Sequence, residues 1–213
     1  MLKVLRPGLA RLLTPAGQAL ARTPITPNML TVIGAIGVSA SALILFPLGY
    51  LFAGTMACTA FVLTDMLDGA LARARGSSGP FGAFLDSTLD RIGDAAVFAG
   101  LAIWLVRGGH QPVLAAVALF CMVAGGLVSY ARARAEGLGL RADVGIAERT
   151  ERLLIGLVAT GLSGLGVPYV LAIGLWVLAV LSAVTFGQRI YAVRKAAVAE
   201  VAAGADAGQP ARS

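Results

Sequence analysis

Long apolar runs, separated by short polar or glycine-containing connections, dominate the hydrophobic pattern of the chain. Six runs come close to or exceed the roughly 20 residues that cross the hydrocarbon core of a bilayer. They cover residues 28–46, 50–73, 81–106, 112–135, 149–166 and 168–190. The third carries several acids in its first half, and the fifth is short and opens with charged residues. The pattern predicts an all-α, polytopic membrane protein with six transmembrane helices.

The two ends of the chain differ from this pattern. Leucines recur at helix-like spacing in residues 2–22, but lysine and arginine interrupt them, which argues against a signal peptide. We expect an interfacial amphipathic helix within residues 1–24, with a disordered basic arm as the alternative. Residues 196–213 are small and low in complexity, so we expect a frayed helix end and a disordered cytoplasmic tail there. Residues 25–195 would then form the six-helix domain.

Composition and charge agree with a membrane location. Hydrophobic residues make up 58% of the chain and charged residues only 13%, whereas soluble domains carry about 25% charged residues. The net charge is +6, and the basic residues gather in every second connection. The positive-inside rule then predicts a plasma-membrane protein with both termini in the cytoplasm. The basic residues form no stripe with aromatic residues between them, so we expect no nucleic-acid binding.

Four aspartates carry the candidate chemistry: Asp65, Asp68, Asp86 and Asp90. Spacings of three and four residues put each pair on one face of a helix. The short turn at residues 76–80 predicts that the two helices are antiparallel neighbours, so that the four carboxylates converge near the cytoplasm. One aspartate at mid-membrane costs roughly 2.5–3.5 kcal/mol, and hard divalent cations would neutralise such a cluster.

These acids predict a site for Mg²⁺ or Mn²⁺, with two ions clamping a phosphate. One alternative is that the acids pair with nearby arginines between closely packed helices. Another is a divalent-cation transporter, although the other apolar runs contain no matching acids at mid-membrane.

The spacing D-x2-D-G-x2-A-R-x8-G-x3-D-x3-D, from Asp65 to Asp90, resembles the signature of the CDP-alcohol phosphotransferase family. The resemblance implies a homodimer of six-helix subunits with a polar cavity open to the cytosol. It implies metal ligation by Asp65, Asp68 and Asp86. Asp90 would touch metal and also act as the base that deprotonates the acceptor hydroxyl, which attacks the β-phosphorus and releases CMP.

The same resemblance implies a set of residues that bind CDP-diacylglycerol. Gly69 and Arg73 would hold the cytidine diphosphate. The opening of the first span resembles the stretch that closes over the nucleotide, at Asn28, Met29, Leu30 and Thr31. Gly79 in the turn is carried over from the family less firmly, because relatives often have a hydroxyl residue there. Without the resemblance, Pro27 would indicate only the start of a helix.

Residues 129–152 also resemble the actinobacterial phosphatidylinositol phosphate synthases within this family, and the similarity runs from about residue 10 to 195. This implies an inositol phosphate acceptor, 1D-myo-inositol 3-phosphate, with its phosphate held by Arg132, Arg152 and Arg189. Glycerol 3-phosphate, which would give phosphatidylglycerol phosphate, is the alternative acceptor. These arginines also suit positive-inside markers. Asp94 lies one turn beyond Asp90 and is expected either to support the acids or to pair with an arginine.

Overall fold

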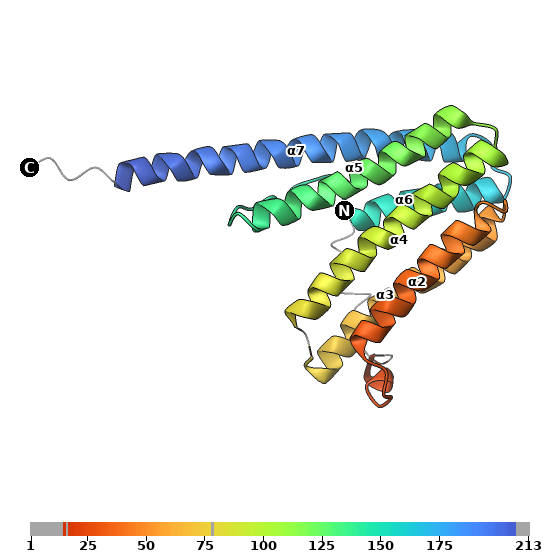
Figure 1. The fold of residues 1–213 in the computed structure, drawn as a ribbon, viewed down its shortest axis with the longest axis horizontal. Helices are drawn as coiled ribbons and strands as arrows, with labels where there is room; N and C mark the ends of the chain where they lie inside the picture. The colour runs from red at the N-terminus through yellow and green to blue at the C-terminus, as the bar shows by residue number, and fades with distance from the viewer. Residues whose placement is uncertain (1–14, 16, 78, 208–213) are drawn as a thin grey trace, which may run out of the picture.

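The computed structural model describes residues 15, 17–77 and 79–207, and six long helices contain most of them (Figure 1). In chain order they are α2 (Pro27–Leu45), α3 (Leu51–Arg75), α4 (Pro80–Arg107), α5 (Pro112–Glu136), α6 (Arg149–Gly164) and α7 (Val170–Ala207). No residue of the described part is in a β-strand. The all-α prediction is confirmed, and each predicted run coincides with one helix.

Local sequence signals explain where the helices begin and end. Proline occupies the first turn of α2, α4 and α5, where its missing N–H costs no intrahelical hydrogen bond. The Thr26 hydroxyl caps α2 by accepting from the Met29 N–H at 3.3 Å. Gly76 ends α3 in the left-handed region at φ 61°, which a side chain would disfavour.

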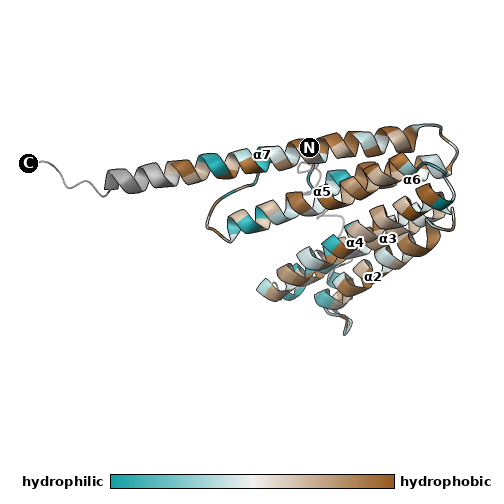
Figure 2. Cartoon of the chain, turned by 45° about the horizontal axis from the view of Figure 1, so that its top comes forward, coloured by the Kyte–Doolittle hydropathy of each residue, from teal (hydrophilic) through white to brown (hydrophobic). Residues whose placement is uncertain are grey.

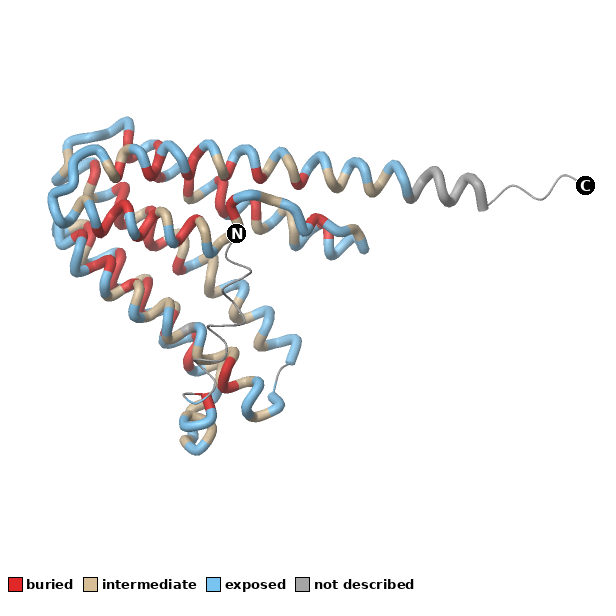
Figure 3. Tube along the Cα trace, turned by 180° about the vertical axis from the view of Figure 1, so that it is seen from behind, coloured by how far each residue is buried: buried red, intermediate tan, exposed pale blue. Residues whose placement is uncertain are grey.

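The core lies in the half of the molecule where the helices converge. There α2 packs against α3 and α4, α5 packs against α4 and α7, and α6 packs against α3 and α7. The core includes the side chains of Phe46, Leu101 and Leu175. A Cβ at Gly100 would lie 2.2 Å from the Ala42 carbonyl oxygen, so glycine is needed for the close approach of α4 to α2. Buried residues gather in this half, and the helices diverge beyond it (Figures 1 and 3).

Four stretches are long and apolar enough to cross a membrane within the described residues: Pro27–Leu45, Leu51–Arg75, Pro112–Glu136 and Val170–Ala199. The other two helices differ for reasons already visible in the sequence. Helix α4 carries acids in its first half, and α6 has only 16 residues. Hydrophobic residues cover most of the bundled helices, and hydrophilic ones are more frequent toward the diverging ends (Figure 2). The chain is thus an integral membrane protein, and crossing by α4 and α6 stays a prediction.

The arrangement of α3 and α4 differs from the prediction. The turn at residues 76–79 connects them, but among the described residues α3 and α4 do not pack along their lengths, whereas α2 packs against both. The prediction that they are antiparallel neighbours is therefore wrong beyond the turn. The physical reason is that their facing residues near the turn include Asp68, Arg73 and Asp86, and these line a cavity instead of an apolar contact.

The structure describes only part of the N-terminal region. Residues 1–14 and 16 lie outside the described residues, so most of the expected interfacial helix is not tested. Residues 17–20 are helical, and a Cβ at Gly17 would lie 2.9 Å from the Ala70 carbonyl carbon of α3. Nη2 of Arg75 donates to the carbonyls of Leu20 (3.4 Å), Ala21 (3.3 Å) and Thr23. Arg75 thus binds the carbonyl end of this short helical turn, where a cation is favoured.

The C-terminal region is more helical than the sequence predicts. Helix α7 continues to Ala207, so residues 196–207 are helical where a frayed helix end and a disordered tail were expected. The alanine-rich composition explains the difference, because alanine has the highest intrinsic helix propensity. Residues 208–213 lie outside the described residues.

The Arg75 contacts predict that Arg75→Gln loosens the segment before α2. Losing charge-assisted hydrogen bonds worth about 1.5–3 kcal/mol should speed local opening by roughly tenfold or more. Limited trypsin digestion, with cleavage after Arg22 followed by mass spectrometry, measures this rate. Arg107→Gln, at the far end of α4, is the matched control and should leave it unchanged. Equal rates in wild type and Arg75→Gln would refute the anchoring role.

Candidate active site

A polar cavity of about 740 Å³ lies where the helices diverge, and five helices contribute to its walls. Its aspartates come from α3 and α4 and are called the acidic wall, and the arginines of α5, α6 and α7 are called the basic wall. Arg73, Arg91, Glu136 and Glu148 also line the cavity. The cavity brings together most of the site residues predicted from the sequence: Asp68, Gly69, Arg73, Asp86, Asp90, Arg132, Arg152 and Arg189. Acids and arginines that are far apart in the sequence therefore line the same cavity.

The acidic wall begins at the end of α3. The Thr31 hydroxyl of α2 donates a hydrogen bond to Oδ2 of Asp68, which ties the opening of α2 to this carboxylate. A Cβ at Gly69 would lie 3.4 Å from Nη1 of Arg73, so the guanidinium folds back over the glycine. The Asp65 backbone belongs to α3, but its side chain is outside the described residues. Its predicted role as a metal ligand is therefore not tested.

Asp90 on α4 is the acid that meets the basic wall. Its Oδ1 lies 2.7 Å from Nη2 of Arg149, and its Oδ2 lies 3.7 Å from Nη2 of Arg91. The Asp90 side chain is only 14% exposed. A carboxylate that is this shielded from water needs a compensating positive charge, and Arg149 supplies it.

Arg152 on α6 is the most deeply buried of the predicted arginines, with a side chain that is 3% exposed. It donates to the Ala147 carbonyl at 3.2 Å and lies 3.5 Å from Oδ2 of Asp94. A Cβ at Gly125 of α5 would come within 3.1 Å of its Nε, so the glycine leaves room for the guanidinium. Asp94 is thus an arginine partner, one of the two roles that the sequence left open.

The other two predicted arginines are also engaged. Arg189 on α7 donates to the carbonyls of Val144 (2.9 Å) and Val128, and so holds the α5–α6 connection onto α7. Arg132 on α5 lies 2.8 Å from Glu136 and 3.3 Å from Asp143. Each guanidinium has five N–H donors, so these contacts leave donors for a further anion.

Five residues expected at the nucleotide are not in the cavity lining: Asn28, Met29, Leu30, Thr31 and Gly79. Asn28 lies near the acid-bearing helix, since a Cβ at Gly82 would come 3.4 Å from its Oδ1. Met29 is exposed and Leu30 is buried in the core. Gly79 is the exposed N-cap of α4. The predicted stretch at the start of α2 therefore reaches the site through Thr31 and its hydrogen bond.

Sequence reasoning missed Arg149, which lines the cavity and contacts Asp90. The signal was its position three residues before Arg152 at the start of α6, which puts both on one face of the helix. In the sequence alone, Arg149 is one of many basic residues near the ends of the apolar runs.

The donor types on the acidic wall fit a hard divalent cation, because they are carboxylate oxygens. Asp68, Asp86 and Asp90 share the cavity. Among the described side chains, no group of three or more acids, histidines or cysteines is close enough to hold one ion. The residues thus match the cation by type, and Asp90 faces an arginine where a metal ligand was expected.

A comparison with known protein families identifies the family of this chain. The family described as CDP-alcohol phosphatidyltransferase matches residues 24–187, which include all six predicted spans almost completely. The chain belongs to this family. It is therefore a CDP-alcohol phosphatidyltransferase, an enzyme of phospholipid biosynthesis, and the transporter alternative is excluded.

Curated relatives of this phosphatidyltransferase carry one name. The phosphatidylinositol phosphate synthase of Streptomyces avermitilis is 46% identical over 200 residues, covering 91% of this chain and 82% of its own length. The phosphatidylinositol phosphate synthase of Mycolicibacterium smegmatis is 47% identical over 192 residues, covering 89% and 86%. The resemblance seen in residues 129–152 is thus confirmed over most of the chain.

Solved structures give the same result. The phosphatidylinositol phosphate synthase of Mycobacterium tuberculosis with CDP-DAG bound superimposes with a TM-score of 0.82 at 46% identity, covering 86% of this phosphatidyltransferase and 94% of that chain. The same enzyme in complex with manganese and citrate gives a TM-score of 0.82 and 46% identity, covering 85% and 88%. The helical arrangement in Figure 1 is therefore the one seen in these enzymes.

Proposed function

We propose that this enzyme transfers the phosphatidyl group of CDP-diacylglycerol to a hydroxyl of an inositol phosphate, 1D-myo-inositol 3-phosphate, giving phosphatidylinositol phosphate and CMP. The observation that carries the proposal is that the aspartates of α3 and α4 and the arginines of α5, α6 and α7 line the same cavity. Two anionic substrates would meet there. The names of the relatives, and the CDP-DAG bound to one of them, support the choice of donor and acceptor.

The donor would bind against the ends of α3 and α4. Gly69 lets the nucleotide approach the backbone, and the Arg73 guanidinium that lies over it would pair with the diphosphate. Thr31 holds Asp68 in place from α2. The diacylglycerol part would lie against the apolar helices that are long enough to cross the membrane, which suits a substrate that stays there. The opening of α2, from Asn28 to Thr31, would border this donor site.

The acceptor would bind against the basic wall. Arg132, Arg152 and Arg189 come from three different helices and line one side of the cavity. Charge-assisted hydrogen bonds from guanidinium forks favour a phosphate group strongly. Arg149 contacts Asp90 and lies one helical turn from Arg152 on α6. A phosphate bound to Arg152 would therefore bring the rest of the acceptor close to Asp90.

Asp90 would act as the base. Its carboxylate takes the proton of the acceptor hydroxyl as the oxygen forms a bond to the β-phosphorus. The bond from this phosphorus to the bridging oxygen breaks, and CMP leaves with the electron pair. General-base catalysis of this kind contributes typically 10²–10⁴-fold. Asp65, Asp68, Asp86 and Asp90 would hold two Mg²⁺ or Mn²⁺ ions, which neutralise diphosphate charge when bound. The manganese in a relative supports this assignment.

We further propose the cellular arrangement. The enzyme would lie in the plasma membrane as a homodimer, with six spans in each subunit, both termini in the cytoplasm and the cavity open to the cytosol. The excess of basic residues in alternate connections supports this orientation. Residues 1–24 would form the interfacial segment, 25–195 the catalytic domain and 196–213 a cytoplasmic tail.

The proposed function predicts the products of a direct assay. Purified enzyme receives CDP-diacylglycerol and Mg²⁺ with inositol 3-phosphate, free inositol or glycerol 3-phosphate, and mass spectrometry identifies the lipids formed. We expect phosphatidylinositol phosphate from the first mixture at the highest rate. Faster formation of phosphatidylglycerol phosphate would instead assign glycerol 3-phosphate as the acceptor.

The assignment of the base predicts that Asp90→Asn lowers kcat by about 10²–10⁴-fold. The amide keeps the shape of the side chain but cannot accept the proton. A single symmetric peak in size-exclusion chromatography, with unchanged CDP-diacylglycerol binding, would show that the variant is folded. Turnover close to wild type in such a preparation would rule out Asp90 as the base.

A further inference from the structure

We infer that Arg149 is a specificity-determining residue that exchanges its ion pair with Asp90 for the phosphate group of the acceptor. This inference rests on the proposed function, because it concerns how that acceptor is distinguished from an unphosphorylated alcohol. Neither the family signature nor the predicted phosphate pocket includes Arg149.

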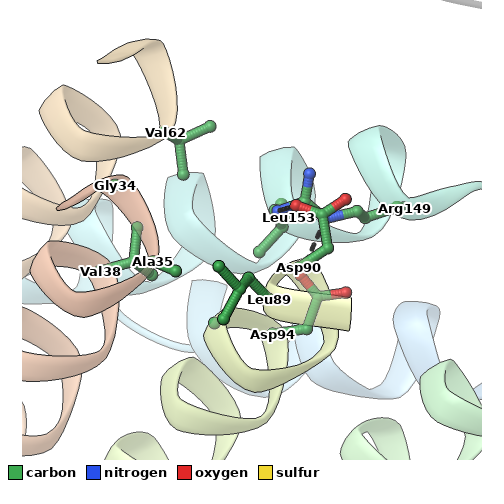
Figure 4. Close-up of a pocket in the computed structure, with 10 residues that line it drawn as sticks. Gly34, Ala35, Val38, Val62, Leu89, Asp90, Asp94, Arg149 and Leu153 are labelled. Atoms are coloured by element: carbon green, nitrogen blue, oxygen red, sulfur yellow. Dashed lines mark hydrogen bonds and ion pairs between the residues drawn. The ribbon is translucent and has the colours of Figure 1, made fainter. Parts of the chain in front are cut away.

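Arg149 lies between two carboxylates on α4, one helical turn apart. Its Nη2 is 2.7 Å from Oδ1 of Asp90, and its Nε is 3.2 Å from Oδ1 of Asp94. Figure 4 shows these three side chains close together, with the apolar side chains of Leu89 and Leu153 beside them. The guanidinium therefore joins the proposed base to an acid outside the family signature.

The two α6 arginines differ in freedom to move. The side chain of Arg152 is 3% exposed and that of Arg149 is 27% exposed, while both lie near Asp94. Asp94 is thus a positioning residue shared by the two cations. Arg149 can turn toward the cavity while its Nε stays beside Asp94, because a guanidinium offers donors in several directions.

The proposed chemistry would be helped by such a movement. An acceptor hydroxyl has to reach an oxygen of Asp90, and in the structure Arg149 lies against Oδ1. A phosphate dianion presents more charge and more acceptor oxygens to a guanidinium than a carboxylate does. An acceptor with a phosphate would therefore draw Arg149 away from Asp90, whereas free inositol has no group that competes for it.

The start of α6 strengthens the attraction for an anion. Arg149 is the first residue of this helix of 16 residues, and Arg149, Thr150 and Arg152 all line the cavity. The positive end of the helix dipole favours phosphate at this position. Arg149 would therefore hold the phosphate between the helix end and the buried Arg152.

The test compares two acceptors in the same protein sample. The ratio of kcat/KM for inositol 3-phosphate to kcat/KM for free inositol is measured in wild type, Arg149→Gln and Arg149→Lys, together with KM for CDP-diacylglycerol. Loss of one charge-assisted hydrogen bond, about 1.5–3 kcal/mol, should lower this ratio by roughly tenfold or more in Arg149→Gln. Arg149→Lys keeps the charge without the fork and should fall between. KM for CDP-diacylglycerol should stay within about twofold of the wild-type value, because the substitution is not expected to change donor binding.

Arg107→Gln serves as the matched control, since it removes a guanidinium from the other end of α4 and should leave the ratio unchanged. An unchanged ratio in Arg149→Gln, or equal losses for both acceptors and for CDP-diacylglycerol binding, would overturn the inference, because either result indicates no role or only a structural one. If Arg149→Gln does not fold, a wild-type ratio in Arg149→Lys would overturn it. Failure of wild type to use inositol 3-phosphate would instead reject the proposed function.

Discussion

The charge balance across the cavity is the constraint on which the site depends. Asp90 and Asp94 on α4 face Arg149 and Arg152 on α6. Most of the surface of each of these four side chains is shielded from water. Removing one partner of such a set leaves an uncompensated charge, which costs several kcal/mol. The apolar packing at the converging end of the bundle holds these helices at fixed positions, so the charged residues meet at the diverging end.

This constraint links structure to catalysis. The charged groups that neutralise each other across the cavity are also the groups that two anionic substrates require. Arg189 and Arg152 keep backbone and carboxylate partners that fix their positions, and a phosphate would take their remaining donors. Arg149 is different, because its partner is the proposed base itself. Substrate binding would then redistribute existing ion pairs and need not leave a shielded charge without a partner.

Much of this was predictable from the sequence, and the failures have physical causes. Helices were predictable because apolar runs of membrane length leave few alternatives. The acids were predictable because spacings of three and four place them on one helix face. The separation of α3 from α4 was not, since a short turn does not reveal that α2 packs against both. The Arg149–Asp90 pair was missed because a basic residue near a membrane end has the same local sequence whether it faces lipid headgroups or an acid.

The proposed function depends on the acidic wall of the cavity acting as a divalent-metal centre for phosphatidyl transfer. The most direct test is equilibrium binding of Mn²⁺ to purified enzyme with CDP-diacylglycerol present, followed by the electron paramagnetic resonance signal of the free ion. We predict saturable Mn²⁺ binding that approaches two ions per chain, and clearly weaker Mn²⁺ binding by Asp86→Asn. Mn²⁺ that stays free, or that binds equally well to Asp86→Asn, would contradict it.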